Sequence, residues 1–129
     1  MPAMPDAVQL TRELLGFNTI NPPGAEQACA RHVGALLERA GFAVDYAEFA
    51  PARTSLVARI GNMSGSAKGR PPLGFTGHID TVPLGAAAWT ADAFGASMEG
   101  GKLYGRGASD MKSGVAAFVI AALGLADKL

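Results

Sequence analysis

The feature that most constrains the fold is a helical run near the end of the sequence that is apolar almost all round. Residues 111–128 predict this helix, and residues 114–126 within it carry no charged side chain. A helix needs about 20 apolar residues to span a bilayer, so this shorter run predicts a buried helix rather than a membrane anchor. A helix without a polar face has to be covered on several sides. We therefore expect it to lie between a sheet and other elements.

Two amphipathic helices are predicted in the first part of the chain. Residues 5–15 have apolar side chains at helical spacing, with Val8 and Leu14 among those available for a core face. The same spacing recurs in residues 25–41, where Gly41 stands at the position of a C-terminal cap. Both helices should pack one apolar face against the core.

Four further stretches predict strands. Residues 42–49 and 54–60 alternate or cluster β-branched and aromatic side chains. A short apolar run, residues 72–77, predicts a buried strand that places His78 at its carboxyl end, which is where open α/β sheets bind their ligands. Residues 94–104 contain two adjacent glycines and predict a hairpin.

These elements together predict an α/β fold with a central mixed sheet and helices on both of its faces. Residues 61–72 are rich in Gly, Ser and Pro and predict a surface connection between strands. The 129 residues are enough for one domain and too few for two. We expect a single core.

Charge and composition exclude several classes of function. The 11 basic residues balance the 11 acidic residues, so the chain has no net charge with which to attract nucleic acid or an anionic membrane. Hydrophobic residues make up 49% of the sequence, which excludes a disordered chain. The one cysteine, Cys29, cannot form an internal disulfide, and the N-terminus lacks the basic and apolar regions of a secretory signal. A reducing, cytoplasmic location fits these features best.

The sequence His78-Ile79-Asp80 is the first candidate for chemistry. On an extended backbone, residues two apart point to the same side, so the imidazole and the carboxylate can share one site. A histidine that binds a metal through one nitrogen usually donates its other N–H to a carboxylate or carbonyl. The alternative is a capped turn with a solvated carboxylate, and the tripeptide alone does not exclude it.

Two longer segments around these residues resemble the signature segments of a zinc-dependent hydrolase family. The first is Gly77-His78-Ile79-Asp80-Thr81-Val82-Pro83, and the second is Gly105-Arg106-Gly107-Ala108-Ser109-Asp110-Met111-Lys112. The family contains acetylornithine deacetylase, succinyl-diaminopimelate desuccinylase, aminoacylase and glutamate carboxypeptidase. Because both segments occur in the right order and separation, the resemblance is specific, and it covers the whole chain.

The resemblance implies a role for three residues. His78 is expected to bind one zinc ion, and Asp80 is expected to support this histidine and to be catalytic. Asp110 is expected to bridge two zinc ions and to precede a cis peptide bond. Two oxygens allow a carboxylate to hold two cations, whereas one imidazole nitrogen donates to one metal. The implied cofactor is Zn²⁺, two per complete site, with Co²⁺ or Mn²⁺ as alternatives.

The implied activity is hydrolysis of the amide bond of an N-acyl amino acid or small peptide. The partners are then a small-molecule substrate and, for the full-length enzyme, a second copy in a homodimer; no nucleic acid or membrane partner is expected. Arg106 and Lys112 are conceivable contacts for a substrate carboxylate, although offsetting local negative charge or lying in solvent is favoured for both. Serine-hydrolase chemistry is not supported, because no Gly-x-Ser-x-Gly motif occurs.

The general base of such a hydrolase is missing from the sequence. In the family this base is the first residue of an adjacent Glu-Glu pair, and none of the five glutamates here is next to another acid. We therefore expect residues 1–129 to be the N-terminal part of a zinc-binding catalytic domain, without the rest of that domain or the dimerisation domain, and inactive alone. Two alternatives are a non-catalytic truncated product and a metal-free binding module of the same fold.

Overall fold

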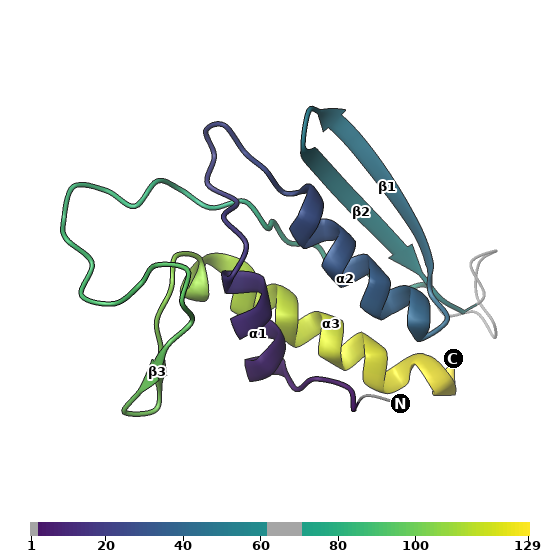
Figure 1. The fold of residues 1–129 in the computed structure, drawn as a ribbon. Coiled ribbons are helices and arrows are strands. Elements are labelled where there is room, and N and C mark those ends of the chain that lie inside the picture. The colour runs from purple at the N-terminus through teal and green to yellow at the C-terminus, as the bar shows by residue number, and fades with distance from the viewer. Residues whose placement is uncertain (1–2, 62–70) are drawn as a thin grey trace.

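The computed structural model describes residues 3–61 and 71–129 and contains three α-helices and two small β-hairpins (Figure 1). The elements are, in chain order, α1 (Ala7–Leu15), α2 (Gln27–Arg39), β1 (Ala43–Ala50), β2 (Arg53–Arg59), β3 (Met98–Glu99), β4 (Lys102–Leu103) and α3 (Ser113–Leu125). An irregular turn, Ala108–Lys112, precedes α3. The predicted surface connection at residues 61–72 lies almost entirely outside the described residues.

Helix α1 is confirmed but begins at Ala7, two residues later than predicted. The Asp6 side chain caps it by accepting a hydrogen bond of 2.7 Å from the backbone N–H of Gln9. Leu10 and Leu14 are fully buried, as expected for a core face. The prediction for Val8 was wrong, because its side chain is half exposed. Val8 lies in the first turn of α1, on the same side as the fully buried Leu15 seven residues later, so its exposure follows from its place at the end of the helix.

Helix α2 lies between the β1–β2 hairpin and the other two helices (Figure 1). Strands β1 and β2 pair in antiparallel register, with Ala43 opposite Arg59. Gly34 permits the close approach of the helix to this hairpin, since a Cβ atom there would overlap the Tyr46 hydroxyl group. Both predicted strands are confirmed, and they form one hairpin.

One apolar core joins the three helices. It is built from residues that are at most 5% exposed, namely Leu10, Leu14, Cys29, Val33, Leu37, Val115, Ala116, Val119 and Leu123. Side chains from the hairpin, including Phe42 and Leu56, pack against it from one side. The three predicted helices are therefore confirmed, and they share a single core.

The predicted central sheet with helices on both faces is not found in the described part of the chain. The two hairpins form separate two-stranded sheets, and the helices that contact β1 and β2 lie on one side of that hairpin. Mixed α/β character is the part of the prediction that holds.

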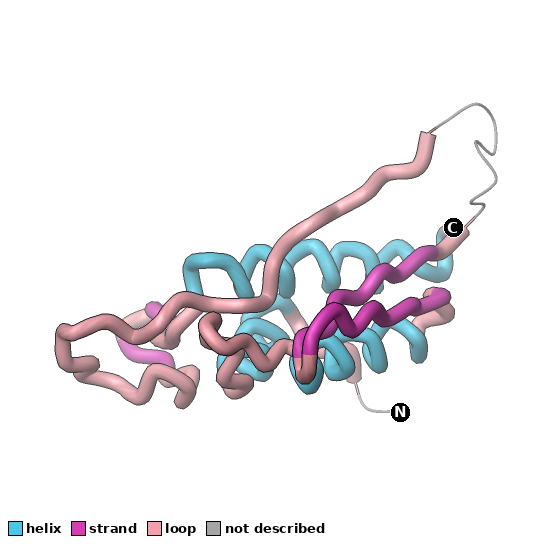
Figure 2. Tube along the Cα trace, turned by 90° about the horizontal axis from the view of Figure 1, so that it is seen from above, coloured by secondary structure: helices cyan, strands magenta, loops and turns pink. Residues whose placement is uncertain are grey.

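The predicted buried strand at residues 72–77 is wrong as well. This segment is a loop (Figure 2), and the Leu73 side chain is 81% exposed. Its residues 75–77 line an apolar groove together with β2 and α3. They are not paired with any described strand. A strand needs a hydrogen-bonded neighbour, and here no described residue supplies one.

Helix α3 confirms the predicted apolar helix but begins two residues later. Asp110 and Met111 have non-helical backbone angles, so regular helix starts at Ser113. By length and apolar composition alone, the run Ala108–Lys128 would suffice to cross a membrane, a criterion that buried helices of folded domains also meet. In this structure Val115 and Val119 are buried in the shared core.

Candidate metal centre

Three residues that the sequence singled out lie together in the structure. The His78 Nε2 atom is 3.0 Å from Asp110 Oδ1, although 32 residues separate the two in sequence. On the other side of the ring, His78 Nδ1 is 3.0 Å from the backbone oxygen of Asp80 and 3.1 Å from its Oδ1 atom. One imidazole therefore lies between two carboxylates.

The loop that carries His78 and Asp80 is held by hydrogen bonds to residues 19–21. Thr81 donates its backbone N–H to the Thr19 oxygen at 3.0 Å and accepts from the Asn21 N–H at 2.8 Å. The Thr19 hydroxyl donates to the Ile79 oxygen at 2.6 Å. These bonds form a short parallel bridge, with Ile20 opposite Thr81. These hydrogen bonds, and not pairing within one of the described sheets, fix the backbone of the site.

Lys112, two residues after Asp110, anchors the turn that carries Asp110. This side chain is only 1% exposed, and its Nζ atom donates to the backbone oxygens of Leu14 and Phe17, both at 2.9 Å. Burial lowers the pKa of Lys112. None of the three roles considered from the sequence describes these contacts, because Lys112 ties the Asp110 turn to the end of α1.

The peptide bond between Asp110 and Met111 is cis, as the resemblance implied. Gly107, at the start of the same turn, has φ of 90°, a backbone conformation that favours glycine. A Cβ atom there would come within 2.7 Å of Thr81 Cγ2, so the turn lies directly against the loop of His78 and Asp80.

The donor atoms fit part of a zinc site. Two ligand atoms, each about 2.1 Å from a tetrahedral zinc, lie roughly 3.4 Å apart, which is close to the separation of His78 Nε2 and Asp110 Oδ1. The side chains of His78 and Asp110 are 48% and 84% exposed, so a metal ion could reach both. Among the residues described, no three His, Cys, Asp or Glu side chains form a metal-binding group. The described residues therefore offer two ligands.

The electrostatic surroundings of His78 favour a positive charge on the ring. Its pKa is raised, first by the hydrogen bond to the Asp80 backbone oxygen, then by the hydrogen bond to Asp110 and by the charges of both carboxylates, while burial opposes the shift. A metal ion would replace the proton on Nε2, because a metal-binding imidazole must be neutral.

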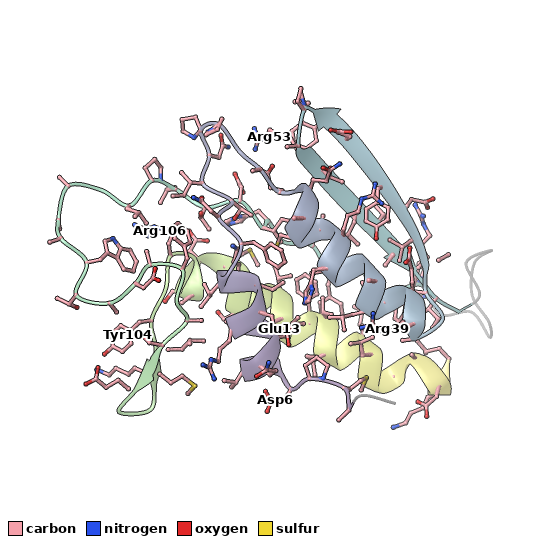
Figure 3. All side chains as sticks on the ribbon, in the orientation of Figure 1. Asp6, Glu13, Arg39, Arg53, Tyr104 and Arg106 are labelled. Carbon is pink, nitrogen blue, oxygen red and sulfur yellow. The ribbon has the colours of Figure 1, made fainter. Side chains whose placement is uncertain are left out.

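Sequence reasoning missed two residues behind Asp80. Asn21 donates from Nδ2 to Asp80 Oδ2 at 3.1 Å, and the nearest guanidinium nitrogen of Arg53 lies 3.9 Å from the same oxygen. Arg53 comes from the start of β2, where Figure 3 labels it, and it pairs with Glu26 at the start of α2. Both contacts join segments far apart in the chain, and no local pattern marks them.

Arg106 lines a pocket together with His78, Asp80 and Asp110, and it holds a loop there. It donates to the backbone oxygens of Pro83 and Leu84, at 3.2 and 3.4 Å, and its guanidinium carbon lies 5.2 Å from the centre of the Trp89 ring. Figure 3 labels it beside this loop. These contacts differ from the solvent-exposed or charge-offsetting role favoured from the sequence.

Known proteins support the resemblance. Residues 74–129 match the model of peptidase family M20/M25/M40. Relatives include the succinyl-diaminopimelate desuccinylases of Wolbachia pipientis subsp. Culex pipiens, 40% identical over 117 residues, and of Rhodospirillum centenum, 44% identical over 122 residues.

These alignments cover 90% and 91% of this chain but only 27% and 30% of the relatives, so the chain spans less than a third of their length. The desuccinylase of Ruegeria pomeroyi gives the same picture, with 44% identity over 93% of the chain and 30% of the relative. The chain is thus similar to peptidase family M20/M25/M40 over residues 74–129, and to the desuccinylases over about nine-tenths of its length.

Proposed function

We propose that this chain is part of a metal-dependent hydrolase that cleaves the amide bond of an N-acyl amino acid, as the names of its desuccinylase relatives suggest. The observation that carries the proposal is the convergence of His78 Nε2 and Asp110 Oδ1 at 3.0 Å, with Asp80 on the opposite side of the imidazole. Side chains of these types, in this arrangement, suit zinc better than they suit a structural role.

Each of the three residues has a distinct task in this proposal. His78 and Asp110 bind the metal, and the two oxygens of Asp110 allow it to bridge a pair of ions. Asp80 keeps the proton of the neutral imidazole on Nδ1, because the Asp80 backbone oxygen and Oδ1, which both face that nitrogen, can only accept a hydrogen bond. The lone pair of Nε2 would then be available to hold a metal ion. Zn²⁺ is the proposed ion, with Co²⁺ and Mn²⁺ as alternatives.

A bound zinc would polarise the substrate carbonyl and lower the pKa of its water toward about 7. The residues of this chain would hold and orient that site. A general base is still required to take the proton from the water, and no Glu-Glu pair occurs in the sequence. We therefore place the chain in the zinc-binding catalytic domain of a longer enzyme, with the base, further ligands and the dimerisation domain in its other parts.

The substrate is proposed to be a succinylated or otherwise acylated amino acid in the cytoplasm, and the whole enzyme a homodimer. Zinc-dependent hydrolysis of N-succinyl-diaminopimelate and N-acetylornithine should be measured for the 129-residue chain and for any longer product of the same reading frame, each beside His78→Ala. Hydrolysis by a product that contains a Glu-Glu pair, and its loss in His78→Ala, would support the proposal. A zinc-loaded product with that pair that cleaves no N-acyl amino acid would contradict it.

A further inference from the structure

The carboxylate of Asp80 is divided between two sets of partners. Its Oδ1 atom faces His78 Nδ1 at 3.1 Å, and its Oδ2 atom accepts from the Asn21 amide at 3.1 Å. A carboxylate that is bonded through only one oxygen can rotate about its Cβ–Cγ bond. With both oxygens occupied, the plane of the Asp80 carboxylate is fixed relative to the imidazole ring.

Asn21 is itself well placed to hold that plane. Its backbone N–H donates to the Thr81 oxygen at 2.8 Å, so the residue is attached to the strand-like segment that carries Asp80. The amide group can donate to a carboxylate, whereas a side chain such as Asp would repel it. Asn21 thus donates its backbone N–H to Thr81 and its side-chain amide to the neighbouring Asp80.

Arg53 adds a positive charge on the same side of Asp80. Its guanidinium group makes hydrogen bonds of 2.7 and 3.2 Å to Glu26, whose side chain is only 6% exposed, and this pair keeps Arg53 close to Asp80 Oδ2. Gly24 leaves room for the group, because a Cβ atom at that position would overlap the guanidinium. The charge of Arg53 disfavours rotation of the carboxylate away from this side.

We propose that Asn21 is a positioning residue for the metal centre, and that it acts through Asp80, with the Arg53–Glu26 pair in support. Asn21 fixes the Asp80 carboxylate, which in turn keeps the neutral His78 protonated on Nδ1 and leaves Nε2 free to bind metal. The inference depends on the proposed function for its purpose. The protonated nitrogen of His78 can nevertheless be measured without metal or substrate.

The experiment compares Asn21→Ala with Asn18→Ala in ¹⁵N-labelled protein. Asn18 is a matched control in the same loop, since its side chain accepts from the Ile20 N–H and does not contact Asp80. Nitrogen chemical shifts of His78 are recorded without metal, at a pH where the imidazole is neutral, and Zn²⁺ affinity is measured by competition with a chelator. Both measurements are repeated with Asp80→Ala and with Asn21→Ala/Asp80→Ala.

Asn21→Ala should move part of the His78 population to the Nε2-protonated form and weaken Zn²⁺ binding by about tenfold, as is typical for the loss of a partner behind a metal ligand. Asn18→Ala should change neither the nitrogen shifts nor the Zn²⁺ affinity. When Asp80 is already replaced by Ala, adding Asn21→Ala should have no further effect on either quantity. If Asn21→Ala does not fold, Asn21→Ser, which is too short to reach Asp80, should give the same result.

Unchanged nitrogen shifts and affinity in the Asn21 variants, or an equal effect with and without Asp80, would overturn the proposal. Because the nitrogen shifts need neither zinc nor turnover, they would stand even if the protein proved not to be a hydrolase. Conversely, if the His78 nitrogen shifts did not change in Asn21→Ala while the enzyme proved to be an active hydrolase, only the role of Asn21 would be rejected.

Discussion

Gly107 lies against Thr81, so closely that a Cβ atom on the glycine would come within 2.7 Å of Thr81 Cγ2. This contact joins the turn that carries Asp110 to the loop that carries His78 and Asp80. The distance between the proposed metal ligands therefore depends on a position at which only hydrogen fits.

Gly107→Ala should separate the two loops and weaken Zn²⁺ binding. Gly85→Ala is the matched control, because Gly85 has a similar φ of 83° but no neighbouring atom within 4 Å of an added Cβ. Both variants carry the strain of a left-handed alanine, about 1–2 kcal/mol. In urea unfolding, the free energy of unfolding should fall by at least about 1 kcal/mol more in Gly107→Ala than in Gly85→Ala. Equal losses of stability and equal zinc affinities in the two variants would contradict a close contact between Gly107 and Thr81.

Replacing the buried Lys112 should be strongly destabilising. Lys112→Met keeps most of the aliphatic chain but leaves the Leu14 and Phe17 backbone oxygens without their donor. A hydrogen bond from a charged group contributes about 1.5–3 kcal/mol, so we expect a loss of roughly 2–4 kcal/mol in the free energy of unfolding. The exposed Lys102 provides the control, and Lys102→Met should change stability by less than about 0.5 kcal/mol. Similar effects at both sites would show that Lys112 is not structural.

The buried thiol of Cys29 should report unfolding. Cys29 is inaccessible in the core, and burial raises its pKa to about 11. At pH 8 a thiol reagent should label the folded protein slowly and the urea-unfolded protein at once. Rapid labelling of the folded chain would contradict the described core.

The same raised pKa sets a direction for stability at alkaline pH. Between the ordinary thiol pKa of 9.0 and about 11, the folded Cys29 keeps its proton while the unfolded thiol loses it. The folded state then binds more protons, so this group's contribution to stability falls as the pH rises through that window. Cys29→Ala, which removes the titration, should lessen the fall.

Two ion pairs of similar length should differ in their effect on stability. The Arg53–Glu26 pair, at 2.7 Å, involves a buried carboxylate, whereas Arg59 and Asp45, at 2.6 Å, are both exposed. Arg53→Ala should lower the melting temperature clearly, because Glu26 would lose its partner while buried. Arg59→Ala should cost no more than about 1 kcal/mol. The reverse order would contradict the burial of Glu26.

The sequence predicted those elements whose stabilising contacts are local. Helical periodicity located α1 and α2, an uninterrupted apolar run located α3, and paired glycines located the β3–β4 turn. The prediction for residues 72–77 was wrong because a strand is stabilised by hydrogen bonds to a neighbour, and the apolar character of a run does not reveal whether that neighbour exists. Val8 was misplaced because periodicity gives the side of a helix on which a residue lies and not whether another element covers that side at its end.

The site could be predicted only in part for a similar reason. His78, Asp80 and Asp110 belong to two short segments whose order and separation are distinctive, and the structure brings the three residues together. Asn21, Arg53 and Lys112 act through contacts that span 27 to 98 positions of the chain. Such contacts depend on the packing of whole elements, which no local pattern encodes.

The metal-binding role of His78 is tested most directly by equilibrium dialysis of wild-type protein, His78→Ala and His32→Ala against graded Zn²⁺ concentrations. His32 pairs with Glu13 away from the site and is the matched control. Wild type and His32→Ala should bind zinc alike, and loss of one of two ligands should weaken binding at least about tenfold in His78→Ala. Wild type should also lose its zinc in metal-free buffer, because two protein ligands hold the ion weakly. Identical binding curves for wild type and His78→Ala would contradict the assignment of His78 as a metal ligand.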